Sequence, residues 1–368
     1  MPNQEQILEA LKAVQDPDLH KDIVTLGFVR NLRIEGTKVD FDLVLTTPAC
    51  PVKDRLSEEA EAAVKALPGV EQVEVRLSSD PSTHQPDKAN ALPGVRHVIA
   101  VASGKGGVGK STVTANLACA LASLGATVGV LDADIYGPSQ VMMLGVSDEP
   151  EIDDNKRLYP PLAHGLKVIS MAMFSGSDEA VVWRGPMVSQ MAQNFVRQVE
   201  WGTLDYLLID MPPGTGDVQL TLSQSVPLAG AVIVSTPQDV ALLDARKGLK
   251  MFEKVSVPVL GMVENMSGFV CDGCGKRHDI FKSGGAERVS RTLGVPYLGS
   301  IPIEPAVAQC GDAGVPAVLA HPESESGKQF LSIAQGLVRS LAVLDATKDT
   351  GLTNSVIEWD SLPEEELA

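Results

Sequence analysis

The segment from Gly104 to Ser111 matches the phosphate-binding pattern G-x-x-x-x-G-K-[ST] without a gap. Four glycines in these eight residues let the backbone turn its N–H groups toward one anion, where a Cβ would keep a phosphate away. The apolar run Val98–Val101 predicts a buried strand before the segment, and apolar residues at helical spacing up to Leu124 predict a helix after it. Because the N-terminus of such a helix attracts phosphate, the sequence predicts a nucleotide site at this point.

Each residue of this phosphate loop is assigned to the nucleotide site. We expect Lys110 to reach the β- and γ-phosphates of ATP and to act in catalysis, and we expect the Ser111 hydroxyl to coordinate Mg²⁺. The residues assigned to nucleotide binding are Gly104, Lys105, Gly106, Gly107, Val108, Gly109, Lys110 and Ser111.

The charge of the chain bears on its partners. The chain has 30 Lys and Arg residues and 47 Asp and Glu residues, so its formal net charge is -17. A charge of this sign repels nucleic acids and anionic lipid at long range. The first residues lack the basic and apolar regions of a signal peptide, and no apolar run is long enough to span a bilayer. We therefore expect a cytoplasmic protein with neither a nucleic-acid nor a membrane partner.

Composition and periodicity divide the chain into four parts. Residues 1–80 show a helix, a hairpin, a second helix and a strand, which predict a small α+β domain. Residues 81–93 are polar and read as a linker. Residues 94–345 alternate strand and helix, the pattern of an α/β domain with a mostly parallel sheet. Residues 346–368 are polar and acidic, so we expect a disordered tail.

Two acidic motifs follow strands of the predicted parallel sheet, at the edge where ligands bind. Asp210 follows an apolar run and is assigned to Mg²⁺. The segment that continues to Asp217 is expected to respond to the γ-phosphate. Asp132 and Asp134 follow an earlier strand, where either residue is alternatively a helix N-cap or a solvated loop residue. The predicted strands are Val98–Ala102, Thr127–Leu131, Leu166–Ile169, Tyr206–Ile209, Ala231–Val234, Val259–Val263 and Tyr297–Ser300.

Cys271 and Cys274 form a C-x-x-C pair that predicts a metal site. A closed zinc site or a four-iron cluster usually takes four protein ligands, so two more are needed. His278 and Cys310 are candidates within the chain, and a twofold dimer would supply the same two cysteines again. Thiolates suit zinc and iron–sulfur clusters alike. A thioredoxin-like redox pair is a third alternative.

Three further cysteines lie elsewhere, which makes five in all, and this odd number argues against a disulfide framework. Cys119 falls within the apolar spacing of the helix after the phosphate loop and is assigned to the core. Cys50 precedes Pro51 at the expected start of a helix. A helix N-terminus lowers the pKa of a thiol, so Cys50 is either a functional thiolate or a small buried residue in a turn.

The second lysine of the loop, Lys105, makes the segment resemble the deviant Walker A loop of dimeric ATPases such as MinD, ParA and the nitrogenase iron protein. The resemblance implies that Lys105 crosses a dimer interface to the partner's nucleotide and acts in catalysis there. It also implies that Asp134 positions or deprotonates the attacking water. Asn265 is similar to the family residue whose side chain binds adenine, although an asparagine after a strand also suits a turn.

The combination of these features resembles the Mrp/ApbC family of iron–sulfur cluster carrier proteins over roughly residues 1–340. The small domain adds to the resemblance, because similar domains carry a cysteine in a Thr-x-Pro-x-Cys-Pro setting, as Cys50 does here. The family implies a P-loop NTPase fold and a homodimeric ATPase whose paired Cys271 and Cys274 hold a bridging [4Fe-4S] cluster. Cluster donors would load this carrier, and apoproteins would receive the cluster. The alternatives are a MinD- or ParA-type positioning ATPase and a zinc-stabilised regulatory ATPase.

Overall fold

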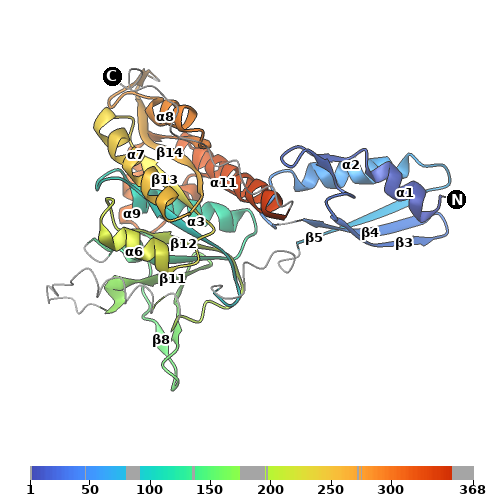
Figure 1. Cartoon of the computed structure of the whole chain (residues 1–368), viewed down its shortest axis with the longest axis horizontal. Helices are drawn as coiled ribbons and strands as arrows, with labels where there is room; N and C mark the ends of the chain where they lie inside the picture. Colours follow the sequence, from blue (N-terminus) through green and yellow to red (C-terminus); the bar gives the residue numbers. More distant parts are fainter. Residues whose placement is uncertain are drawn as a thin grey trace.

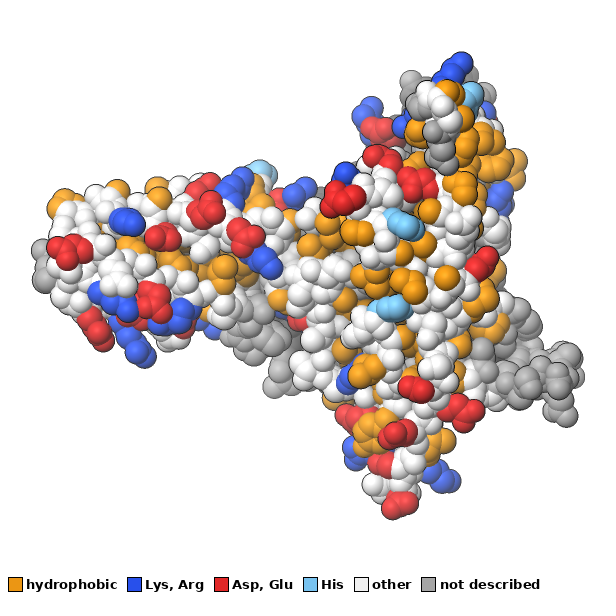
Figure 2. Space-filling model, turned by 180° about the vertical axis from the view of Figure 1, so that it is seen from behind, with side chains coloured by type: hydrophobic (Ala, Val, Ile, Leu, Met, Phe, Trp, Pro, Cys, Tyr) orange, Lys and Arg blue, Asp and Glu red, His pale blue; other side chains and the backbone are white. Residues whose placement is uncertain are grey.

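The computed structural model describes residues 2–45, 47–79, 92–134, 137–174, 195, 198–271, 273–274 and 276–349. They form a small domain (residues 2–79) and a large domain (residues 92–349), which is the α/β organisation with a preceding α+β unit that the sequence predicts. Figure 1 shows the small domain projecting from the side of the large domain, next to the end of its last helix. On the small domain, acidic and basic side chains lie interspersed on the face that Figure 2 shows.

The small domain packs two helices on one face of a three-stranded sheet (Figure 1). The central strand pairs antiparallel with one neighbour and parallel with the other. Asn3 caps the first helix, because its side chain accepts from the Gln6 N–H at 2.9 Å while Gln6 bonds back to the Asn3 N–H. Its elements are α1 (Gln4–Leu11), β1 (Gln15–Asp16), β2 (Lys21–Asp22), β3 (Val29–Glu35), β4 (Lys38–Leu45), α2 (Lys53–Lys65) and β5 (Gln72–Ser79).

The large domain is built on a nine-stranded sheet in the order β10-β11-β7-β12-β6-β13-β14-β15, with β16 beside β14. Only the pairs β10–β11 and β14–β15 are antiparallel, so the prediction of a mostly parallel sheet is confirmed. The described strands of the large domain, of which β8 and β9 pair in a separate two-stranded sheet, are β6 (Val95–Ala102), β7 (Val128–Asp132), β8 (Glu151–Ile152), β9 (Leu158–Tyr159), β10 (Leu162–Ala163), β11 (Leu166–Ser170), β12 (Leu204–Asp210), β13 (Gly230–Ser235), β14 (Val259–Val270), β15 (Arg277–His278) and β16 (Tyr297–Ile303).

Helices cover both faces of this sheet. Along β6, Ile99 and Val101 point to one core and Val98 and Ala100 to the other, which is why the strand reads as a continuous apolar run. One core includes Phe330 of the last helix. The helices are α3 (Lys110–Ser123), α4 (Gln140–Met143), α6 (Asp217–Ser225), α7 (Asp239–Lys254), α8 (Gly285–Leu293), α9 (Pro305–Asp312), α10 (Ala317–Ala320) and α11 (Glu325–Asp349), with the short 3-10 helix η1 (Met171–Phe174).

Two predicted boundaries differ from the structure. Helix α11 continues to Asp349, so residues 346–349 are helical and do not belong to a disordered tail, because the apolar spacing that buries Leu341 extends to Leu344. Leu92, assigned to the linker, is only 7 % exposed and packs in a core of the large domain. The remainder of the predicted linker and tail, 81–91 and 350–368, lies outside the described residues.

No helix in the described part of the chain is both long enough and apolar enough to cross a membrane.

The small domain has a core of its own, which can be tested. We expect Leu56→Ala to lower its free energy of unfolding by about 2–5 kcal/mol, because the Leu56 side chain is fully buried and the change leaves a cavity. Hydrogen–deuterium exchange should show faster exchange in β4 with β6 of the large domain unchanged. Leu77→Ala, at a side chain that is 44 % exposed, is the control. Equal acceleration in β4 and β6 would mean that the two domains unfold as one unit.

Candidate nucleotide and metal sites

The phosphate loop lies between β6 and α3, as the sequence predicts. Ser103 donates from its hydroxyl to the Lys105 carbonyl at 2.9 Å and fixes the entry to the loop. A Cβ on Gly104 would clash with the backbone carbonyl of Asp244 in α7, so this glycine lets the loop lie directly against that helix. Gly109 has φ +82° and precedes the first helical residue, Lys110. The loop conformation therefore depends on glycine at both ends.

A buried ion pair connects the loop to the predicted Mg²⁺ ligand. Lys110 Nζ lies 2.5 Å from Asp210 Oδ1, and it also lies 3.2 Å from the Ser111 hydroxyl. The Asp210 carboxylate is fully buried at the end of β12. It accepts two further hydrogen bonds, from the Thr114 hydroxyl at 3.1 Å and from the Gln140 amide at 2.9 Å. The structure thus brings Lys110, Ser111 and Asp210 together, and it adds Thr114 and Gln140, which the sequence did not single out.

Asp132 lies opposite Asp210 on the neighbouring strand β7. Its carboxylate accepts from the Ser170 hydroxyl at 3.0 Å and from the backbone N–H groups of Ser139, Gln140 and Asp134 at 3.0 to 3.2 Å. Burial, and next the charge of Asp210, raise the pKa of Asp132 to about 7. The side chain holds the segment after β7 in place. Asp132 is fully buried at the end of β7 and the N-cap of α4 is Ser139, so it is neither a solvated loop residue nor a helix N-cap.

Asp134 and Asp217 lie at the same edge of the sheet. Asp134 follows β7 by two residues and is 8 % exposed. Asp217 is the first residue of α6, seven residues after Asp210, and its side chain lies outside the described parts. The catalytic role of Asp134 and the switch role of the segment that ends at Asp217 stay predictions.

Asn265 makes a contact that the sequence does not reveal. Strand β14 continues past the predicted end at Val263, and the Asn265 amide donates to the Val108 carbonyl of the phosphate loop at 2.9 Å. A Cβ on Gly109 would clash with this same amide. Asn265 therefore supports the loop from the side, and its contact with adenine stays a prediction.

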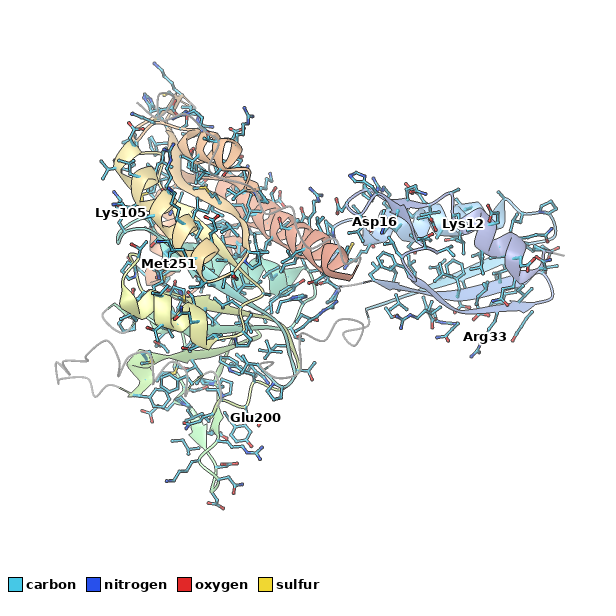
Figure 3. All side chains as sticks on the ribbon, in the orientation of Figure 1. Lys12, Asp16, Arg33, Lys105, Glu200 and Met251 are labelled. Carbon is cyan, nitrogen blue, oxygen red and sulfur yellow. The ribbon has the colours of Figure 1, made fainter. Side chains whose placement is uncertain are left out.

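Lys105 lies on the side of the large domain away from the small domain (Figure 3). It borders an open hollow whose other walls come from the start of α7 and from the segment before α8. Apolar side chains are strongly exposed around it: Val240 is 65 % and Ile280 56 % exposed. Lys282 and Asp239 form an ion pair across the hollow at 2.6 Å.

The two cysteines of the C-x-x-C pair lie in the turn between β14 and β15. Cys271 donates from its N–H to the Lys276 carbonyl at 3.0 Å, and the Cys274 N–H donates to the Cys271 carbonyl at 3.4 Å. Cys274 is exposed and Cys271 partly exposed. Within the described residues, no group of three or more metal-ligating side chains is found. The hairpin therefore presents two thiols at the surface.

The other candidate ligands differ in position. His278 is exposed on β15, paired with Phe269 of β14, so it belongs to the same hairpin. Cys310 is 7 % exposed within α9. Cys119, within α3, is 1 % exposed and lies in the core, as predicted. Burial raises the pKa of the Cys119 thiol to about 12. These two buried thiols are unsuited to a surface metal site.

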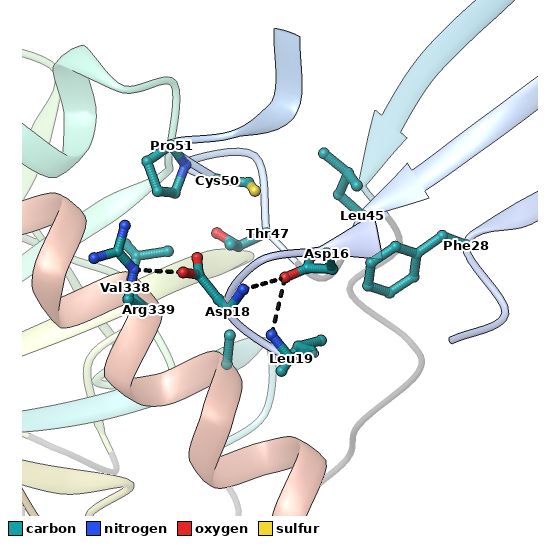
Figure 4. A pocket seen from close by; sticks show the side chains of 11 residues that line it. Asp16, Asp18, Leu19, Phe28, Leu45, Thr47, Cys50, Pro51, Val338 and Arg339 are labelled. Carbon is teal, nitrogen blue, oxygen red and sulfur yellow. Dashed lines mark hydrogen bonds and ion pairs between the residues drawn. The ribbon is translucent and has the colours of Figure 1, made fainter. Parts of the chain in front are cut away.

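Of the two alternatives for Cys50, the thiolate with a lowered pKa does not agree with the structure. Helix α2 begins only at Lys53, and Cys50 lies in a small cavity between the domains (Figure 4). Burial is the largest effect and, with the carboxylates of Asp16 and Asp18, it raises the pKa of the thiol to about 11. Desolvation of the thiolate outweighs the opposite effect of a backbone hydrogen bond with Val52, so the thiol is protonated in this arrangement.

Comparisons with known proteins agree with this geometry. Residues 94–338 match the family model described as NUBPL iron-transfer P-loop NTPase, and residues 4–75 match that of an iron-sulfur cluster assembly protein. The iron-sulfur cluster carrier protein of Synechocystis is 50 % identical, with 92 % of this chain and 97 % of that protein covered.

Two solved structures share the fold of the large domain. A nucleotide-binding protein of Archaeoglobus fulgidus, solved with ADP, is 39 % identical, covers 65 % of this chain and 93 % of its own, and has a TM-score of 0.57. The cell division ATPase MinD of Pyrococcus furiosus is 26 % identical with a TM-score of 0.51, over 66 % of this chain and 98 % of its own. The phosphate loop, the sheet and these matches show that the chain belongs to the NUBPL iron-transfer P-loop NTPase family.

Proposed function

We propose that this protein is a homodimeric ATPase that carries a [4Fe-4S] cluster on Cys271 and Cys274 and delivers it to apoproteins in the cytoplasm. The observation that supports it most directly is the placement of two surface thiols in the turn directly after β14, the strand whose Asn265 supports the phosphate loop. Strand β14 therefore connects the nucleotide site to the thiol pair. The curated relatives named as iron-sulfur cluster carriers support the choice of cargo.

The donor set at the nucleotide site fits Mg²⁺. The Ser111 hydroxyl and the Asp210 carboxylate both contact the same cation, the Lys110 ammonium, so they already converge on one positive charge. These two residues would hold the ion, which when bound neutralises phosphate charge. The loop N–H groups and Lys110 bind and orient the phosphates, and Asp134 orients the attacking water.

A dimer would complete the thiol site. Two cysteines per chain provide two of the four ligands that a cluster needs. A twofold axis brings the same two thiols from the partner subunit. The exposed Val240 and Ile280 beside Lys105 form an apolar surface that association would bury. Lys105 then reaches the nucleotide of the partner. Cluster donors load the dimer, and apo clients receive its cluster.

The metal role of Ser111 leads to a first nucleotide-site prediction. Ser111→Ala should lower ATP hydrolysis by about a hundredfold or more, since one preorganised group at the phosphates is lost, with the thermal unfolding temperature unchanged. Thr112→Ala, which removes the neighbouring hydroxyl, is the matched control in a phosphate-release assay. Lys110→Ala is less selective, because it leaves the buried Asp210 carboxylate without its cation and costs stability as well. Hydrolysis at the wild-type rate in Ser111→Ala would remove this loop from the active site.

Lys105 should act across the dimer. We expect Lys105→Ala to reduce ATP hydrolysis and cluster transfer at least tenfold while the ATP affinity of the chain changes little, because its target lies on the partner's nucleotide. Lys247→Ala, at a lysine of α7 that is 68 % exposed, is the control. Equilibrium ATP binding is compared with single-turnover hydrolysis. A loss confined to affinity would assign Lys105 to its own subunit's phosphates.

The cysteine pair is tested by anaerobic reconstitution. The dimer should take up about four iron and four sulfide, and Cys271→Ala or Cys274→Ala should each remove nearly all of it. Cys119→Ala and Cys310→Ala, at the two buried thiols, are the controls. Iron and sulfide analysis with the visible spectrum gives the readout. A dimer that instead holds one tight zinc ion and takes up no iron and sulfide would establish the zinc-stabilised alternative.

A further inference from the structure

The two domains meet through a narrow seam. Within the part of the chain that the structure describes, the helices and strands of the small domain pack broadly only on one another. The seam is formed by the loop after β4, the loop after β1 and the last turns of α11 (Figure 4). Interfaces of this kind permit relative domain motion unless they are large and apolar.

Two polar contacts close the seam. Thr47 and Tyr206 of β12 share a buried hydrogen bond of 2.7 Å between their hydroxyls. Asp18 pairs with Arg339 of α11, with 2.7 Å between Oδ1 and Nε. The loop after β4 adds a small apolar contact to the seam, because its Ala49 is buried in the core of the large domain. No sequence motif predicts either contact, because each joins residues that lie far apart in the chain.

Cys50 lies within this closed seam. Its cavity is lined by Asp16, Asp18 and Pro51 on one side and by Val338 and Arg339 of α11 on the other. Cys50 is partly exposed, and residues of both domains cover the remainder of its side chain (Figure 4). Separation of the domains would uncover the side that faces α11.

We propose that the Thr47–Tyr206 and Asp18–Arg339 contacts form a latch that shields the partly exposed Cys50 thiol, and that opening of the seam exposes it further for reaction. In the closed state the thiol is protonated, because burial raises its pKa to about 11. When α11 moves away, more water reaches the thiol, its pKa falls and a larger fraction is thiolate. The latch thus decides when the small domain can offer a sulfur ligand or nucleophile. This device does not depend on what the Cys271–Cys274 hairpin binds.

The test is alkylation of the full-length, metal-free protein with N-ethylmaleimide, followed by mass spectrometry of each cysteine peptide over time. In the wild-type protein, Cys50 should react at least tenfold more slowly than the exposed Cys274 and faster than Cys119 of the core. Labelling of Cys50 before Cys119 shows that the seam opens without unfolding of the large domain. Labelling of Cys50 as fast as Cys274, or only together with Cys119, overturns the proposal.

Variants test the two latch contacts. Tyr206→Phe and Arg339→Ala should each accelerate Cys50 alkylation about two- to tenfold, the range expected for one hydrogen bond or one partly exposed ion pair, with Cys119 unchanged. The charge exchange Asp18→Arg with Arg339→Asp should restore protection. Arg291→Ala, which removes an ion pair of the same 2.7 Å length outside the seam, is the control. Unchanged Cys50 labelling in both single variants means that these contacts are no latch. The wild-type comparison stands even if a variant fails to fold.

Discussion

The buried ion pair between Lys110 and Asp210 is the contact on which the arrangement of the large domain depends. Two charges in the interior are tolerated because they compensate each other and because Thr114 and Gln140 satisfy the remaining carboxylate positions. The pair fixes the start of α3 to the end of β12, and Gln140 adds α4. The groups expected to handle phosphate and metal are therefore in place at one edge of the sheet.

Strand β14 runs from the nucleotide site to the turn that contains the cysteine pair. Its Asn265 supports the phosphate loop, and next to it the fully buried Glu264 accepts from the N–H groups of Gly284 and Ala286 at the start of α8. The strand then ends one residue before Cys271. A cluster carrier controlled by nucleotide needs a connection between its nucleotide site and its thiol pair. Strand β14 is a short connection of this kind, and a hydrogen bond joins it to the phosphate loop.

The seam shows how the environment of a side chain can reverse a local expectation. Cys50 lies just ahead of α2, a position that favours a thiolate, yet desolvation by both domains and two nearby carboxylates favour the protonated thiol. The same residue in a solvated small domain would have different chemistry. Domain position is therefore part of the chemistry of this protein.

The local patterns of the sequence were sufficient for seven of the nine described strands of the large sheet, all except β10 and β15, for the phosphate loop and for the C-x-x-C pair. Each arises from residues close together in the chain: glycine freedom at Gly109, apolar runs such as Val98–Val101, and the spacing of Cys271 and Cys274. Family resemblance supplied the rest of the expected roles. These seven strands and the position of the loop agree with the structure because their signals are short-range, although β14 continues beyond its predicted end.

Only the tertiary structure decided the contacts between distant residues. The hydrogen bond from Asn265 to Val108 and the seam contact of Thr47 with Tyr206 each join positions more than 150 residues apart. The raised pKa of Asp132 likewise follows from burial beside Asp210 on another strand. Burial and through-space charge depend on which elements become neighbours, and no local pattern of residues encodes that.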